Sequence, residues 1–352
     1  MSRFKEYSIL PGFRTTFSIT ILWLTILVLL PLSTLIVNTA LIGFDEIPFR
    51  VVEEGKVTRK TIYLKEVDLA EKTWVEAETA LSGDTVKANS YGELVDVSLE
   101  EVELQAVTAW ERFWSGVKRG LPAFFEKAFN RRVLMSLKVT FGTAFFAALI
   151  NLFLGGIIAY ALVRIKLPGK RIVDALIDLP FAMPTAICGI AMVTMYAPNG
   201  PIGSLAAKAG IKLAFTETGI TLALLFIGLP FVVRALQPAL EDLGTELEDA
   251  AMSLGASRFT AWRRVIVPTL SPAILSGFTL AFARGLGEYG TVIFIAGNTP
   301  YKTEITSLLI VTQLEQFDYS GATAIALTML TISLALIFGI NKFFAGRHHH
   351  AR

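Results

Sequence analysis

The stretch VTFGTAFFAALINLFLGGIIAYALV, residues 139–163, contains no charged side chain. A helix needs roughly 20 apolar residues to cross a hydrocarbon core of about 30 Å, so this stretch is long enough to span a membrane. Other charge-free runs reach or approach that length, at 15–44, 179–207, 218–233, 265–283 and 319–341. The pattern therefore predicts a polytopic membrane protein.

The composition agrees with a membrane location. Hydrophobic residues make up 53% of the chain and charged residues 18%, and the mean hydropathy is +0.57. This composition is too apolar for a soluble domain. With neighbouring residues added to each run, we predict an all-α fold with six transmembrane helices. They are expected at 16–41, 137–162, 173–196, 215–234, 268–296 and 319–341.

Basic residues in short loops and tails predict the orientation, because they resist translocation. They gather before the first span, between the second and third spans, and after the last: Arg3, Lys5, Arg14, Arg164, Lys166, Lys170, Arg171, Lys342 and Arg347. We therefore expect both termini in the cytoplasm of a multi-pass protein. Residues 1–44 form the N-terminus with the first span, 131–342 the five-helix core, and 343–352 a cytoplasmic tail.

Residues 45–130 are the one sizeable polar block, and acidic residues outnumber basic ones there, as suits an extracytoplasmic inserted domain. Alternation predicts strands at 49–52 and 57–64, and helical spacing predicts a helix at 98–118. We interpret the block as a small mixed α/β module. The aromatic residues of the predicted helix, Trp110 and Trp114 among them, suit a lipid headgroup layer or a partner site.

Several chemistries find no support in the sequence. There is no G-x-x-x-x-G-K-[ST] loop, so any ATP hydrolysis belongs to another polypeptide. The three histidines all lie at 348–350, where they resemble a tag remnant, and the single cysteine, Cys188, lies inside a predicted span. We therefore expect no catalytic residue, metal site or bound cofactor. The basic residues are spread along helix ends, which does not indicate nucleic-acid binding.

The cytoplasmic stretch 241–268 is too patterned for a simple connector. Apolar residues at helical spacing predict a first helix that Gly255 ends, and Ser257 then caps a second helix before Pro268 opens the next span. The small residues Ala250 and Ala251 allow another surface to approach the backbone closely. Acidic side chains flank them at Glu246, Glu248 and Asp249.

The spacing in this stretch resembles the E-A-A-x3-G-x9-I-x-L-P loop of ABC importer permeases. Asp249 stands for the glutamate, and Val265 and Val267 stand for the Ile and Leu of the pattern. The resemblance implies that the loop at 241–268 forms a coupling helix seated in a separate ATPase, which would hold ATP and Mg. It implies ATPase-coupling roles for Glu248, Asp249, Ala250, Ala251, Gly255 and Pro268.

Residues 1–44 and 106–342 resemble more closely the sulfate/thiosulfate permease subunits called CysT. The similarity is carried by LPGF at 10–13, LPFAMPTA at 179–186, PFVVR at 230–234, GEYG at 287–290, FIAGN at 294–298, KTE at 302–304 and FDY at 317–319. Molybdate permeases share several of these stretches. The insertion at 45–105 departs from the shorter family loop, and the resemblance implies no role for it.

Arg284 and Glu288 place two charges in the fifth predicted span, where charge is costly. They are four residues apart, so a helix would place them on one face as an ion pair. A guanidinium suits an oxyanion, and the alternative is a structural pair that locks the helix. Pro184, Thr185 and Ser276 complete the predicted pathway. Pro180 and Pro184 interrupt the third predicted span, and Asp174 and Asp178 precede them, which predicts either a gate or a kink for packing.

The resemblance implies a subunit that imports sulfate or thiosulfate by alternating access in a bacterial inner membrane. Its expected partners are a second, CysW-like permease subunit, two copies of a CysA-like ATPase and an extracytoplasmic sulfate-binding protein. One alternative is a molybdate or tungstate permease working as a homodimer. Another is a membrane receptor or channel with a sensing domain at 45–130.

Overall fold

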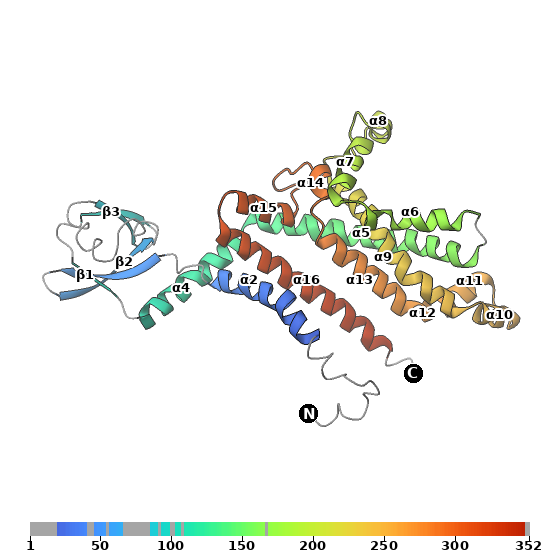
Figure 1. Cartoon of the computed structure of the whole chain (residues 1–352), viewed down its shortest axis with the longest axis horizontal. Coiled ribbons are helices and arrows are strands. Elements are labelled where there is room, and N and C mark those ends of the chain that lie inside the picture. The colour runs from blue at the N-terminus through green and yellow to red at the C-terminus, as the bar shows by residue number, and fades with distance from the viewer. Residues whose placement is uncertain are drawn as a thin grey trace, which may run out of the picture. The chain divides into compact units, whose positions relative to one another are not determined.

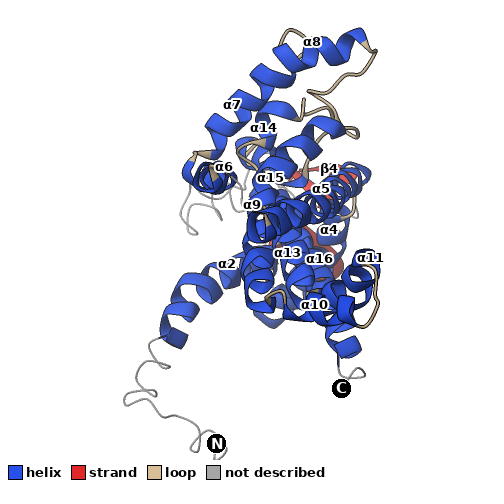
Figure 2. Cartoon of the chain, turned by 90° about the vertical axis from the view of Figure 1, so that its right-hand side faces the viewer, coloured by secondary structure: helices blue, strands red, loops and turns tan. Residues whose placement is uncertain are grey.

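The structure is a computed structural model in which helices dominate (Figures 1 and 2). It describes residues 20–40, 46–53, 56–65, 85–90, 93–98, 103–106, 109–165 and 168–348. The chain divides into two compact units, residues 1–128 with 319–327, and residues 129–318 with 328–352. The predicted tail at 349–352 and the N-terminal residues 1–19 lie outside the described residues.

In the first unit, the described residues form five strands. β1 (Glu46–Glu53) pairs antiparallel with β2 (Lys56–Lys65) and with β5 (Glu103–Ala106), in the order β2-β1-β5. β3 (Thr85–Ser90) and β4 (Glu93–Ser98) form a separate antiparallel pair. The two predicted strands are confirmed by β1 and β2.

The helix predicted at 98–118 is wrong in its first part. Residues 103–106 are strand β5, because their backbone pairs with β1 from Phe49↔Ala106 to Val52↔Glu103. Helix α4 (Ala109–Ala128) begins only after that strand. On α4, the rings of Trp110, Phe113 and Trp114 are exposed and contact one another. Exposed aromatic side chains suit a lipid headgroup layer. The first apolar span comprises η2 (Thr25–Leu29) and α2 (Leu30–Ala40).

The second unit is built on three long helices that pack side by side (Figure 1): α5 (Arg131–Arg164), α9 (Glu217–Leu243) and α13 (Ser271–Leu286). Small residues bring their backbones close, as is usual for helices in lipid. A Cβ at Gly155 of α5 would lie 2.9 Å from Val232 of α9, and one at Gly228 of α9 would collide with the Asn151 side chain. The core lies at these crossings.

Among the described residues, four helices are long and apolar enough to cross a membrane: Thr20–Thr39, Arg131–Arg164, Glu217–Leu243 and Tyr319–Lys342. These correspond to four of the predicted spans. Two bent helix pairs raise the number to six if each pair counts as one span. The last helix, α16, runs from Tyr319 to His348.

The span predicted at 173–196 is not one helix. α6 (Lys170–Ala182) ends before Met183, and α7 (Thr185–Tyr196) starts after Pro184. The angle between α6 and the segment Thr185–Lys208, which includes α7 and α8 (Pro201–Lys208), is 111°. The ring of Pro184 disfavours helical backbone at Met183, whose ψ is 136°.

The span predicted at 268–296 is also wrong as a continuous helix. α13 ends at Leu286, and α14 (Val292–Ile295) is separate. The Glu288 carboxylate accepts a hydrogen bond from the backbone N–H of Thr291, so this side chain caps the turn that follows α13. α15 (Thr306–Glu315) completes the unit, and Thr306 donates its backbone N–H to Thr140 of α5.

Candidate functional site

The loop between α9 and α13 has the predicted form of a helix, a glycine turn and a second helix. α10 (Glu246–Ser253) is followed by α11 (Arg258–Ala261), the π-helical turn η5 (Trp262–Ile266) and α12 (Val267–Thr269). These elements lie at the end of the bundle where α5 and α9 finish and α13 begins (Figure 1).

Gly255 ends α10 as predicted. Its φ is +84°, a backbone conformation that other residues rarely adopt. Ala256 N–H bonds to Ala251 C=O and Gly255 N–H bonds to Met252 C=O, which is the Schellman arrangement for a helix C-terminus. Ser257 then accepts a hydrogen bond from Thr260 N–H and caps α11. The turn is thus fixed by its own backbone.

The outer side of the loop presents apolar side chains to the surroundings. Leu254 is 89% exposed and Phe259 68%, and the Phe259 ring stacks on Trp262. Ala250 is exposed beside them, and Ala251 is half-buried. Pro268 lies in α12, close to the start of α13. Exposed apolar side chains grouped in this way mark a surface that another molecule covers.

Glu248 does not belong to that outer side. Arg164, at the end of α5, donates from Nε to Glu248 Oε1 over 3.1 Å and from a terminal nitrogen to the Gly244 carbonyl. The Arg164 and Glu248 side chains are only 12% and 18% exposed. Glu248 therefore clamps α10 to α5, whereas Asp249 remains exposed. The sequence could not reveal this clamp, because the two residues lie 84 positions apart.

Arg284 and Glu288 form the predicted ion pair, 2.6 Å apart, although Glu288 lies beyond the end of α13. The Glu288 side chain is 2% exposed and its second oxygen binds Thr291 N–H. Thr291 in turn donates its hydroxyl to the Thr185 carbonyl, which joins the turn to the first residue of α7. We call Arg284, Glu288, Thr291 and Thr185 the polar cluster.

Two further predicted pathway residues differ in position. Pro184 precedes Thr185 and so lies next to the polar cluster, at the break between α6 and α7. Ser276 lies eight residues before Arg284 on α13, about 12 Å along the helix, and its side chain is exposed. The structure therefore brings Pro184, Thr185, Arg284 and Glu288 together and leaves Ser276 apart.

Two more arginine–carboxylate forks lie in the second unit, one between two helices and one between α5 and the loop that precedes α15. Arg234 of α9 binds both carboxylate oxygens of Asp178 on α6, at 2.9 and 2.6 Å, and its third nitrogen lies 3.4 Å from Asp174. Arg132 of α5 binds both oxygens of the buried Glu304, at 2.8 and 2.6 Å. Sequence reasoning noted the two aspartates but did not find Arg234 as their partner.

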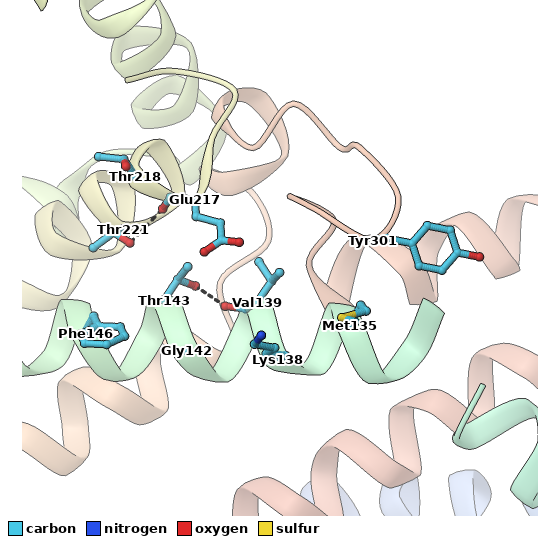
Figure 3. Close-up of a pocket in the computed structure, with 10 residues that line it drawn as sticks. All are labelled: Met135, Lys138, Val139, Gly142, Thr143, Phe146, Glu217, Thr218, Thr221 and Tyr301. Atoms are coloured by element: carbon cyan, nitrogen blue, oxygen red, sulfur yellow. Dashed lines mark hydrogen bonds between the residues drawn. The ribbon is translucent and has the colours of Figure 1, made fainter. Parts of the chain in front are cut away.

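A hollow of about 440 Å³ lies where α5 and α9 begin (Figure 3). Lys138 lines it from α5, Glu217 points into it from α9, and Tyr301 closes one side. Neither Lys138 nor Glu217 forms an ion pair with its side chain within the described ranges. Because one lysine and one glutamate line it, the charge of the lining gives no preference for an anion. No pattern in the sequence indicates this hollow.

Residues 151–347 match the family model described as "Binding-protein-dependent transport system inner membrane component". The chain belongs to this permease family. The match covers the broken span, the whole loop between α9 and α13, and the polar cluster. The described residues 109–165 and 168–348 form helices and the connections between them, as a polytopic α-helical permease requires.

Curated relatives extend the comparison. The permease is 51% identical to the "Probable sulfate transport system permease protein cysT" of Chlorokybus atmophyticus, over 62% of its length and 76% of that protein. It is 45% identical to the "Sulfate transport system permease protein CysT" of Salmonella typhimurium, over 66% and 80%, and 44% identical to that of Escherichia coli, over 67% and 81%.

Solved structures share the fold. A bacterial ABC transporter "involved in the import of the acidic polysaccharide alginate" aligns with a TM-score of 0.53 at 16% identity, over 63% of the permease and 81% of that chain. The alginate transporter in complex with its pentasaccharide-bound periplasmic protein aligns with a TM-score of 0.52 at 16% identity, over 67% and 88%. At this identity the likeness describes the fold alone.

Proposed function

We propose that the permease is the membrane subunit of an ATP-driven importer for sulfate or thiosulfate. The observation that carries this proposal is the loop between α9 and α13, which combines the ABC-permease spacing with an exposed apolar outer side. The names of the curated relatives support the choice of sulfate. A family defined by binding-protein-dependent transport favours this function over a receptor or channel.

In this proposal a separate ATPase, which holds ATP and Mg, binds the loop around Ala250, Ala251 and Gly255. Two features suit the loop to transmit force. The Schellman turn at Gly255 and the Arg164–Glu248 clamp resist deformation of α10, and the clamp connects α10 directly to α5. A push on the loop therefore moves a helix of the bundle. Closure of the ATPase dimer would exchange inward- and outward-facing states.

Arg284 is the residue we propose for contact with the oxyanion. Its guanidinium uses one terminal nitrogen for Glu288, and the side chain remains 31% exposed. A guanidinium carries five N–H donors, so donors remain for a tetrahedral oxyanion. Glu288 is oriented by Thr291 and so holds Arg284 in place. The pair then has a positioning role and a transport role together.

The remaining assembly follows from this function. We infer a CysW-like second permease subunit, two CysA-like ATPase subunits and an extracytoplasmic sulfate-binding protein in a bacterial inner membrane. Both termini of this chain and the loop between α9 and α13 would face the cytoplasm, and the insertion at 45–105 would face outward. Only the ATPase subunits would be enzymes.

The test is ATP hydrolysis by the complex purified through this chain and reconstituted in liposomes. Binding protein loaded with sulfate or thiosulfate is expected to stimulate hydrolysis and to deliver the radiolabelled anion into the liposome. Binding protein loaded with molybdate serves as the control and should do neither. If only molybdate or tungstate stimulated hydrolysis, that anion and not sulfate would be the substrate. A stable complex without any ATPase would contradict the proposal that the chain belongs to an ATP-driven importer.

A further inference from the structure

An apolar groove of about 690 Å³ runs along the surface of the second unit near the loop. Its lining comes from the second half of α5, including Phe153, Gly156 and Tyr160, from α9, and from the segment that leads into α13. Phe153 is 69% exposed and Trp262, which lines the groove at the loop, is 47% exposed. Nothing in the described part of the chain covers these side chains.

The size of the groove limits what fills it. A helix about 10 Å wide that rises 1.5 Å per residue would place only about six residues in this volume, so a spanning helix could lie along the groove but not within it. The lining offers carbon surface, and the ring tips of Tyr160 and Trp262 are its polar exceptions. A narrow, unbranched apolar ligand matches both properties, and acyl chains of phospholipids surround any protein at this depth.

Charge at the loop end of the groove indicates which lipid fits. Trp262, Ile266 and Val267 all line the groove, at spacings of four and five residues, so they share one face of the π-helical turn. Arg263 lies next to this face, whereas Arg264 is about half a turn away. Both arginines are exposed, and neither forms an ion pair or a hydrogen bond among the described residues.

We propose that the groove binds one acyl chain of an anionic membrane phospholipid, with the phosphate of its headgroup held by Arg263. An arginine beside an apolar groove at the cytoplasmic interface gives such a lipid both of its contacts. The inference rests on the proposed function, because it places the loop at the cytoplasmic membrane surface. Bound there, the lipid would contact α5, η5 and α13 at once and would stabilise the loop against the bundle.

The headgroup contact is tested by native mass spectrometry of the purified, delipidated complex titrated with phosphatidylglycerol. Arg263→Gln is expected to weaken binding about fivefold. The matched control Arg264→Gln removes the same charge from the opposite side and should change binding by less than about twofold. Phosphatidylcholine binding should respond to neither. Equal effects of the two substitutions would overturn the proposed headgroup contact.

The acyl-chain contact is tested at Gly156. A Cβ there meets only Leu236, at 3.8 Å, so Gly156→Ala should bind lipid normally, whereas Gly156→Leu fills the groove and should lower phosphatidylglycerol binding severalfold. Unchanged binding in the Leu variant would overturn the proposal, and so would loss of the second permease subunit from that variant, because a protein surface would then cover the groove. No transport or hydrolysis is measured, so either failure leaves the importer function untouched.

Discussion

The loop between α9 and α13 and the polar cluster each depend on an arginine–glutamate pair, but the two pairs work in opposite settings. Arg164 and Glu248 join residues from different helices and leave the outer side of the loop exposed. Arg284 and Glu288 lie four residues apart in the chain, and the Glu288 side chain is buried. In the proposed function, the first pair therefore stiffens a surface for the ATPase, whereas the second holds a charge inside the bundle.

The largest effect is expected from Glu288→Ala. This change leaves Arg284 without its partner and Thr291 N–H without its acceptor, and breaking a buried pair costs about 3–5 kcal/mol. Thermal unfolding of the complex in detergent measures the loss. Glu315→Ala, at an exposed position, is the control and should be neutral within about 0.5 kcal/mol. A stable Glu288→Ala complex would mean that the cluster is not a structural centre.

A smaller and more local effect is expected from Arg164→Gln. Loss of hydrogen bonds from a charged donor should lower the free energy of local opening of α10 by about 1.5–3 kcal/mol, with the bundle unaffected. Hydrogen exchange at the amides of Glu246–Ser253 measures it. Arg171→Gln removes an exposed arginine from α6 and should leave those amides protected. If α10 exchanges no faster in the Arg164 variant, the clamp does not stiffen the loop.

The smallest change in stability is expected from Arg284→Lys, which separates the structural role of Arg284 from its proposed contact with the anion. Arg284→Lys keeps a positive charge beside the buried Glu288, so the pair is not broken and the cost should be far below that of Glu288→Ala, about 1 kcal/mol. It removes the planar set of donors, so sulfate uptake should fall about tenfold or more if these donors contact the anion. Uptake of labelled sulfate into liposomes, normalised to folded complex, measures this. Unchanged uptake would assign Arg284 to structure alone.

Local signals explain why the loop could be predicted. The glycine at 255, the cap at Ser257 and the apolar spacing of α10 all act within a few residues, so the sequence contains them directly. The same holds for the ion pair of Arg284 and Glu288, whose partners are close in the chain. The helix end at Leu286 was missed, although the side-chain capping by Glu288 that accompanies it is also local.

The rest depends on partners far apart in the chain. Residues 103–106 have a helical pattern and become a strand because β1 supplies backbone partners. The forks from Arg234 to Asp178 and from Arg132 to Glu304 join residues 56 and 172 positions apart. An interruption at Pro184 is predicted from the sequence, but the 111° bend between α6 and α7 goes with the packing of α6 on α9 and of α7 on α14. Such contacts require the folded chain.

The most direct test of the coupling loop uses a new cysteine at its outer side. Cys188 is buried, so Ala250→Cys supplies an accessible thiol that a short photoreactive cross-linker can label. In the intact complex we expect this position to cross-link to the ATPase subunit. Leu205→Cys on α8, which is 65% exposed, is the matched control and should not cross-link to it. Cross-linking from Leu205→Cys but not from Ala250→Cys would contradict the account.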